Sequence, residues 1–148
     1  MKRIRWANVP IPEGHIALLL LGVGLHLWRP RRLFQTSQAG RRLAWPLLLS
    51  GAFLAGWAVA AAQDQDIQKP SRLVTTGPYA YTRNPMYLAW NMIYVAAALL
   101  ANSTWLLALL PALIFFTHFY AIKPEERYLD RQFGETYRRY CARVRRYL

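Results

Sequence analysis

The chain has 148 residues, the size of one ordinary domain, and we expect a single domain over residues 1–148. Hydrophobic residues make up 55% of it and charged residues 18%, proportions that exclude a disordered chain. Nineteen Lys and Arg against seven Asp and Glu give a net charge of +12, which suits contact with anionic lipid or nucleic acid. One cysteine and three scattered histidines supply no zinc-type ligand cluster, so no metal site is expected.

The first apolar run, from Gly14 to Trp28, has two interpretations. A basic segment precedes it, as in a secretory signal peptide. No small-residue cleavage site follows, however, and the run leads directly into Arg29-Pro30-Arg31-Arg32. The run can also lengthen toward Val9 if two prolines occupy its first turn. We therefore predict a membrane-spanning helix over about residues 10–28.

Two longer stretches predict three more membrane helices. Residues 43–62 contain no ionisable side chain, and 20 residues of helix extend about 30 Å, the thickness of the hydrocarbon core of a bilayer. Residues 86–122 contain no Asp, Glu, Lys or Arg, and His118 is their single histidine. The segment divides at the polar sequence Asn102-Ser103-Thr104, which predicts a hairpin of helices over about 86–101 and 104–122. The predicted fold is all-α, a membrane bundle with four transmembrane helices.

The distribution of Lys and Arg over the connections predicts the orientation. With four spans, the amino end, the second loop and the tail share one face and carry 14 of the basic residues, whereas the first loop carries five. The positive-inside rule then places the carboxyl terminus in the cytoplasm. We expect a multi-pass protein of a bacterial-type inner membrane, with the lipid bilayer as its partner. No nucleic-acid partner is expected, because the polar tail, residues 123–148, is too short to fold as a binding module.

The second loop, residues 63–85, has the sequence of a structured segment. Gly77-Pro78 favours a turn, and Asn84-Pro85 favours an extended residue followed by the first turn of a helix. A helix start leaves about four amide N–H groups without intrahelical partners, which attract an anionic ligand group, and Arg83 adds positive charge there. Three tyrosines fit either the walls of a pocket or an aromatic belt at headgroup depth, and composition alone favours the belt. They are Tyr79, Tyr81 and Tyr87.

The tail has helical spacing. Its apolar side chains recur at steps of four, four, three and four, which predicts an amphipathic helix lying on the membrane. They are Leu129, Phe133, Tyr137, Tyr140 and Val144. Glu125 and Glu126 follow Pro124 and fit the positive end of a helix dipole, but they also fit acceptors of hydrogen bonds from ribose hydroxyls or partners of a cationic ligand.

Three motifs occur together in the second half of the chain. They are Leu-Val-Thr-Thr-Gly-Pro-Tyr over residues 73–79, Arg-Asn-Pro-Met-Tyr over residues 83–87, and Glu125-Glu126 followed by Leu129, Phe133-Gly134, Tyr137 and Tyr140. In this order and spacing, on either side of a helical hairpin, residues 72–148 resemble the isoprenylcysteine carboxyl methyltransferase family of integral membrane enzymes. They resemble the phospholipid N-methyltransferases more loosely. The resemblance favours a binding pocket over an aromatic belt.

The resemblance implies a methyltransferase whose cofactor, S-adenosyl-L-methionine, enters from the cytosol and whose acceptor arrives from the lipid. It implies no metal ion and identifies no catalytic residue. The residues that would bind the cofactor are Arg72, Leu73, Val74, Tyr79, Asn84, Pro85, Met86, Tyr87, Glu125 and Glu126.

The chain departs from the family pattern at two positions. Asn84 stands where many relatives have histidine, so we expect it to position a ligand and not to transfer protons. Relatives that methylate carboxyl groups have an arginine four residues before the first acidic residue, and here that position is Ala121. The expected function is methyl transfer to a lipophilic or small carboxylate or thiol acceptor. A phospholipid N-methyltransferase and a non-catalytic membrane scaffold subunit are the alternatives.

Overall fold

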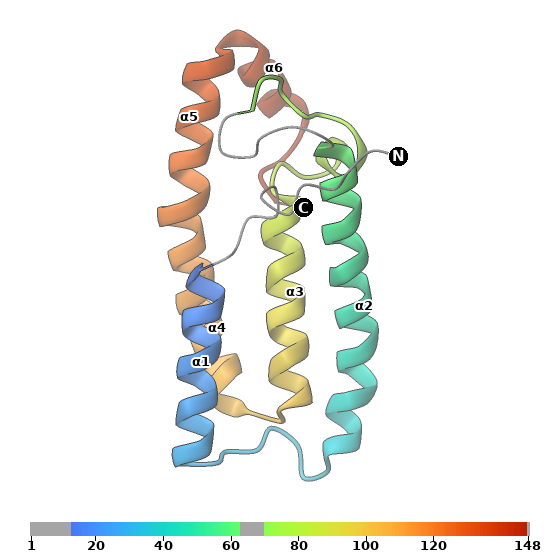
Figure 1. Cartoon of the computed structure of the whole chain (residues 1–148), viewed down its shortest axis with the longest axis vertical. Helices are drawn as coiled ribbons and strands as arrows, with labels where there is room; N and C mark the ends of the chain where they lie inside the picture. The colour runs from blue at the N-terminus through green and yellow to red at the C-terminus, as the bar shows by residue number, and fades with distance from the viewer. Residues whose placement is uncertain (1–12, 63–69, 148) are drawn as a thin grey trace.

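The computed structural model describes residues 13–62 and 70–147. Four helices, α1 (Glu13–Trp28), α2 (Ser37–Ala62), α3 (Pro85–Leu100) and α4 (Thr104–Phe116), run up and down beside one another (Figure 1). The described residues form no strand, only an isolated bridge between Arg32 and Ser103. The predicted all-α class is confirmed, and the second loop and the tail lie at one end of the bundle, opposite the first loop.

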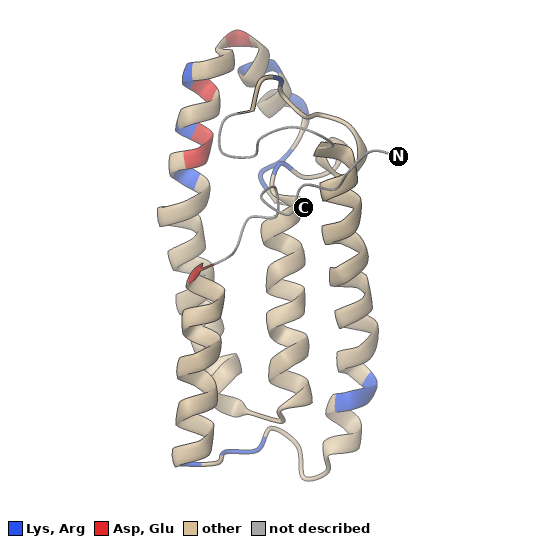
Figure 2. Cartoon of the chain, in the orientation of Figure 1, with Lys and Arg blue, Asp and Glu red and all other residues tan. Residues whose placement is uncertain are grey.

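Two of the helices pass the length and hydropathy test for a membrane span. They are the helix Ser37–Ala62 and the continuous helix Thr104–Phe133, whereas α1 and α3 are apolar but shorter. Charged side chains gather at the two ends of the bundle and are nearly absent from its middle (Figure 2). The structure therefore supports a membrane protein with at least two candidate spans, and the four-span topology stays a prediction.

Helices α2 and α3 pack closely because small residues lie between them. A Cβ atom at Gly51 would lie 3.1 Å from the carbonyl oxygen of Ala89, and one at Gly40 would lie 2.6 Å from that of Leu99. Small residues allow such approach of helix backbones in bundles that lack a hydrophobic driving force between helices. This packing fixes the end of α2 beside the start of α3, where the second loop connects them.

Polar contacts tie the other helices to α3. The ring Nε2 of His15 on α1 lies 3.2 Å from Oδ1 of Asn91, and the Tyr94 hydroxyl donates a hydrogen bond of 3.1 Å to the carbonyl of Leu106 on α4. Tyr94 and Leu106 also belong to the buried core cluster. These pairs satisfy polar groups inside an apolar bundle, where an unpaired group is costly.

The fourth helix continues beyond the apolar segment. A π-helical turn, η3 (Thr117–Ile122), joins α4 to α5 (Lys123–Phe133) without a break, and the Lys123 N–H bonds the carbonyl of His118 five residues earlier. Pro124 has no N–H and its ring clashes with the carbonyl four residues before it, so a wider turn accommodates it. The helix predicted over 104–122 therefore extends to Phe133.

The predicted single helix over the tail is wrong. Gly134, at φ +50°, ends α5, and α6 (Glu135–Arg143) folds back toward the bundle. A positive φ favours glycine, which is why the chain turns here although the apolar spacing runs through it.

The other predicted bounds differ by a few residues: α2 begins at Ser37, six residues before 43, and α3 covers Pro85–Leu100. Residues 10–12 of the first predicted helix lie outside the described residues.

Candidate functional site

Two adjoining cavities lie where the second loop, the start of α3, α5 and α6 meet. The larger has a volume of about 640 Å³ up to its open mouth, and the smaller has about 320 Å³. Tyr79, Arg83, Asn84 and Glu125 line both, so the two cavities form one site.

The described part of the second loop, from residue 70 onward, is folded onto the end of α2. A short 3₁₀ turn, η2 (Gly77–Ala80), carries Tyr79 into the site, and Gly77 has φ +62°. A Cβ atom at Gly77 would lie 2.9 Å from that of Ala61, so both the backbone angle and the space require glycine. Asn84, at φ −128°, precedes Pro85, and α3 starts there as the Asn-Pro sequence predicts.

Glu125 joins the α5 side of the site to α3. The Tyr87 hydroxyl donates a hydrogen bond of 3.1 Å to Oε2 of Glu125. Burial, and less strongly the neighbouring Glu126 carboxylate, raise the pKa of Glu125 above its ordinary value, although the bond from Tyr87 opposes this. Burial and the charge of Glu125 likewise raise the pKa of Tyr79. The site thus holds an acidic group whose ionised form lacks full solvation.

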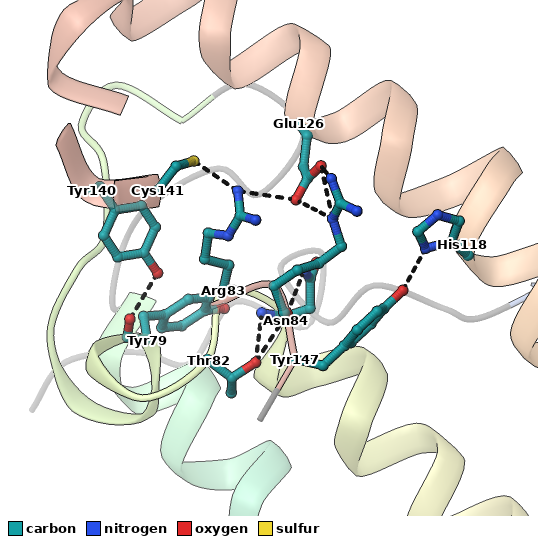
Figure 3. A network of polar contacts seen from close by, with 10 residues as sticks. Tyr79, Thr82, Arg83, Asn84, His118, Glu126, Tyr140, Cys141 and Tyr147 are labelled. Atoms are coloured by element: carbon teal, nitrogen blue, oxygen red, sulfur yellow. Dashed lines mark hydrogen bonds and ion pairs between the residues drawn. The ribbon is translucent and has the colours of Figure 1, made fainter. Parts of the chain in front are cut away.

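Glu126 is shared by two arginines. Arg83 Nη1 lies 3.3 Å from its Oε1, and Arg146 Nη2 lies 2.7 Å from its Oε2 (Figure 3). The Arg146 Nε also donates to both carboxylate oxygens, at 2.9 and 3.1 Å, so this pair is bidentate. The side chains of Glu126 and Arg83 are only 14% and 15% exposed, which makes this a mostly buried charge cluster.

Arg83 links the second loop to α6 through its side chain. Its Nη1 also donates to Sγ of Cys141 at 2.7 Å, whereas its buried Nε has no hydrogen-bond partner among the described residues. The Tyr140 hydroxyl, one residue before Cys141, donates to the Tyr79 carbonyl at 2.7 Å. Burial raises the pKa of Tyr140 to about 12, so this hydroxyl keeps its proton.

The last described residues form a C-terminal strap, residues 144–147, that lies across the start of α3. The Arg145 carbonyl accepts the Arg83 N–H at 3.0 Å, and the Arg146 carbonyl accepts the Asn84 Nδ2 at 3.0 Å and the Thr82 hydroxyl at 3.2 Å. The Tyr147 hydroxyl lies 2.6 Å from Nδ1 of His118 (Figure 3). The strap therefore holds the second loop against the fourth helix.

The structure brings all ten predicted cofactor residues to this site. The larger cavity is lined by Arg72, Leu73, Val74, Tyr79, Asn84, Glu125 and Glu126, and the smaller by Tyr79, Asn84, Pro85, Met86, Tyr87 and Glu125. Tyr81, considered with them as a possible wall, is instead 71% exposed and lies near Trp57. Their role in binding the cofactor stays a prediction.

Several residues of the site were not predicted. Tyr137, Tyr140 and Leu129 line the larger cavity, although their spacing suggested the apolar face of a membrane-surface helix. Arg146 was missed altogether, because an arginine in a basic tail has no signal of its own. Two other basic residues near Ala121, Lys123 and Arg131, could in principle take the place of the arginine that carboxyl-methylating relatives have there. Neither lines either of the two cavities: Lys123 lies over the ring of Phe119, and Arg131 is exposed. The described residues contain no group of side chains suited to a metal ion.

The comparison with protein families covers the same elements. A model of the family described as phospholipid methyltransferase matches residues 43–136, which is more than half of the chain. No curated protein and no solved structure matches the chain. The matched range includes the second loop, α3, α4 and the acidic pair of α5, and it corresponds to the looser of the two resemblances drawn from the sequence, so the isoprenylcysteine carboxyl methyltransferase type stays a prediction. The chain therefore belongs to the phospholipid methyltransferase family.

Proposed function

We propose that this protein transfers a methyl group from S-adenosylmethionine to the amine of a lipid headgroup, at the membrane surface. The observation that carries the proposal is the shared site: the second loop and the acidic pair of α5 line the same cavity at one end of an apolar bundle. A polar cofactor and an acceptor held in the bilayer meet only at such a boundary. The family match supports methyl transfer.

The lining residues fit the cofactor chemically. S-adenosylmethionine, when bound, supplies a methyl group already activated as a sulfonium, beside an amino group, a carboxylate, ribose hydroxyls and a purine. Glu125 and Glu126 offer acceptors for hydroxyls and partners for cationic groups. The buried Nε of Arg83 is a donor without a partner among the described residues. Leu73, Val74 and the aromatic rings of the site suit a flat apolar base.

The charges of the site favour an amine acceptor over a carboxylate. Among the described residues, Glu126 forms salt bridges with Arg83 and Arg146, whereas Glu125 accepts a hydrogen bond from Tyr87. The Glu125 carboxylate, which lines both cavities, attracts a positively charged headgroup amine. Arg83 is already engaged by Glu126, and the position four residues before Glu125 is Ala121. A carboxylate acceptor would instead be repelled by the Glu125 carboxylate.

Methyl transfer demands little of the protein beyond placement. The protonated amine must first pass its proton to the Glu125 carboxylate or to water at the open mouth of the cavity, which leaves a lone pair on nitrogen. The N–C bond would then form as the S–C bond breaks, and the electrons of the S–C bond would return to sulfur. This displacement needs alignment and exclusion of water, which a cavity enclosed by the second loop and α6 provides. No covalent enzyme intermediate is required.

The test supplies labelled S-adenosylmethionine to the protein in vesicles that contain phosphatidylethanolamine, and separates the products. We expect label in the extracted lipid. Label in protein ester or in a volatile thioether instead would contradict the amine acceptor and favour the carboxylate or thiol acceptors that the sequence resemblance implies.

Calorimetry with the cofactor product, S-adenosylhomocysteine, tests the cofactor site separately. We expect binding by the wild-type protein and at least tenfold weaker binding by Glu125→Gln, since a charged partner in a mostly buried site is worth about 1.5–3 kcal/mol. Glu135→Gln is the matched control, because this carboxylate is exposed and lies outside the cavity. Folded protein that binds no product would instead be a scaffold subunit.

A further inference from the structure

The end of the bundle opposite the site carries five exposed arginines: Arg29, Arg31, Arg32, Arg41 and Arg42. None of them forms a salt bridge, and none of the acidic residues that the structure describes lies at this end (Figure 2). Five cations without a protein counter-charge repel one another, so their positions favour an anionic partner. We call them the first-loop arginines.

The loop that presents Arg29, Arg31 and Arg32 is held in a fixed shape, and Arg41 and Arg42 follow near the start of α2. The Asn102 side-chain oxygen accepts the Leu33 and Phe34 N–H groups at 3.1 and 2.9 Å, and its nitrogen donates to the Phe34 carbonyl at 3.0 Å. The Arg31 carbonyl accepts the Thr104 N–H at 2.9 Å. Asn102 has φ +49°, a strained backbone angle that asparagine tolerates better than most residues. In this conformation its side chain makes the hydrogen bonds that hold the loop.

Tryptophans place the same loop at the membrane interface. Arg29 lies over the ring of Trp28, which is 72% exposed, and Arg31 lies over the ring of Trp105. The Trp105 Nε1 donates to the Arg29 carbonyl at 2.7 Å, which fixes that ring against the loop. Exposed tryptophan gathers at headgroup depth in membrane proteins, where lipid phosphates lie.

We propose that the first-loop arginines bind the headgroup phosphate of an anionic phospholipid. The guanidinium group pairs with phosphate through two hydrogen bonds, and a preformed loop loses little conformational entropy when it does so. The proposal requires that the protein reside in a membrane but does not depend on methyl transfer. It also explains why this end keeps five positive charges that the positive-inside rule disfavours there.

The test uses tryptophan fluorescence in nanodiscs. Three tryptophans serve as reporters: Trp28 at the end of α1, Trp45 in the first third of α2 and Trp105 in the first turn of α4. Trp6, Trp57 and Trp90 are replaced by Phe. Acyl chains brominated near the headgroup quench the reporters when the lipid is adjacent. At equal mole fraction, we expect the brominated anionic lipid to quench at least about twofold more than the brominated neutral lipid, since each basic residue at an anionic surface favours binding about fivefold.

A triple variant locates the effect. Arg29→Gln, Arg31→Gln and Arg32→Gln together should remove the excess quenching by the anionic lipid. The control, Arg131→Gln, Arg139→Gln and Arg143→Gln, removes the same charge from exposed tail positions and should keep the excess. Circular dichroism checks that both variants fold. Equal quenching by both lipids before the arginines are changed, survival of the excess in the loop variant, or its equal loss in both variants would overturn the proposal.

Free phosphate is separated from lipid by competition. Inorganic phosphate, added at constant ionic strength, should leave the excess quenching unchanged, because the tryptophan-lined loop selects a phosphate held at the membrane surface. Abolition of the excess by inorganic phosphate would show a site for the free ion and overturn the assignment to lipid.

Discussion

Replacing Arg146 by Gln should release the C-terminal strap without unfolding the bundle. The bidentate pair between Arg146 and Glu126 is charge-assisted, but the Arg146 side chain is 36% exposed, which weakens it. We assign it about 1.4 kcal/mol, a value between those of exposed and buried pairs. The open population of the strap should therefore rise about tenfold.

Native-state hydrogen exchange measures this opening directly. The Arg83 N–H donates to the Arg145 carbonyl, so this amide exchanges when the strap opens. Its exchange rate should rise about tenfold in Arg146→Gln, whereas amides inside α3 should keep their rates. Arg145→Gln is the matched control, because its exposed side chain makes no described contact while its carbonyl remains in place.

If the Arg83 amide of folded Arg146→Gln exchanged within about twofold of the wild-type rate, the ion pair would contribute nothing to holding the strap, which would contradict the prediction. Equal acceleration by Arg145→Gln would assign the effect to overall charge instead.

Three further predictions concern pH, the second loop and the first loop. Burial raises the pKa of Glu125 above its ordinary value of 4.5, so protonation of this carboxyl stabilises the folded, ligand-free protein. This contribution to the free energy of unfolding is fully present below pH 4.5 and is lost as pH rises through the raised pKa. Thermal unfolding of the wild type and of Glu125→Gln at several pH values measures it. Cofactor affinity should change in the opposite direction, rising with pH as Glu125 ionises, and calorimetry at several pH values should show a flat profile in Glu125→Gln. Gly77→Ala should destabilise the fold by about 1–3 kcal/mol, because its φ is positive and the new Cβ would meet Ala61; an unchanged melting temperature would contradict this. Asn102→Gly keeps the backbone angle but loses three hydrogen bonds, so it should speed amide exchange at Leu33 and Phe34, and unaltered exchange there would count against the proposed grip on the loop.

Helix positions followed from the sequence because charge in a membrane helix is costly, so charge-free windows mark helices directly. The turn at Asn102 was predicted from its polar residues. The hydrogen bonds from the Asn102 side chain to the first loop were not predicted, because their partners are backbone groups of Leu33 and Phe34. Backbone acceptors have no residue-type signature. For the same reason, nothing in the sequence pointed to the strap, which bonds Thr82 and Asn84 through its carbonyls.

The break between α5 and α6 in the tail was missed for a different reason. The apolar spacing of the tail is continuous from Leu129 to Tyr140, and periodicity alone therefore favoured one helix. Gly134 was the signal for the break, because glycine adopts the positive φ found there without a clash from a Cβ atom. The ten residues that the resemblance assigns to the cofactor line the two cavities, and their role in binding stays a prediction.

The continuous helix from Thr104 to Phe133 is a candidate membrane span whose far end carries one side of the candidate site. Glu125 stands 21 residues from its start, about 30 Å along the axis at 1.5 Å per residue. Tilting the helix by about 5° about its lower end would displace the carboxylate sideways by about 3 Å, and helices tilt in response to hydrophobic thickness. Since Tyr87 lies on a separate helix, α3, such a tilt would change the distance between its hydroxyl and the Glu125 carboxylate.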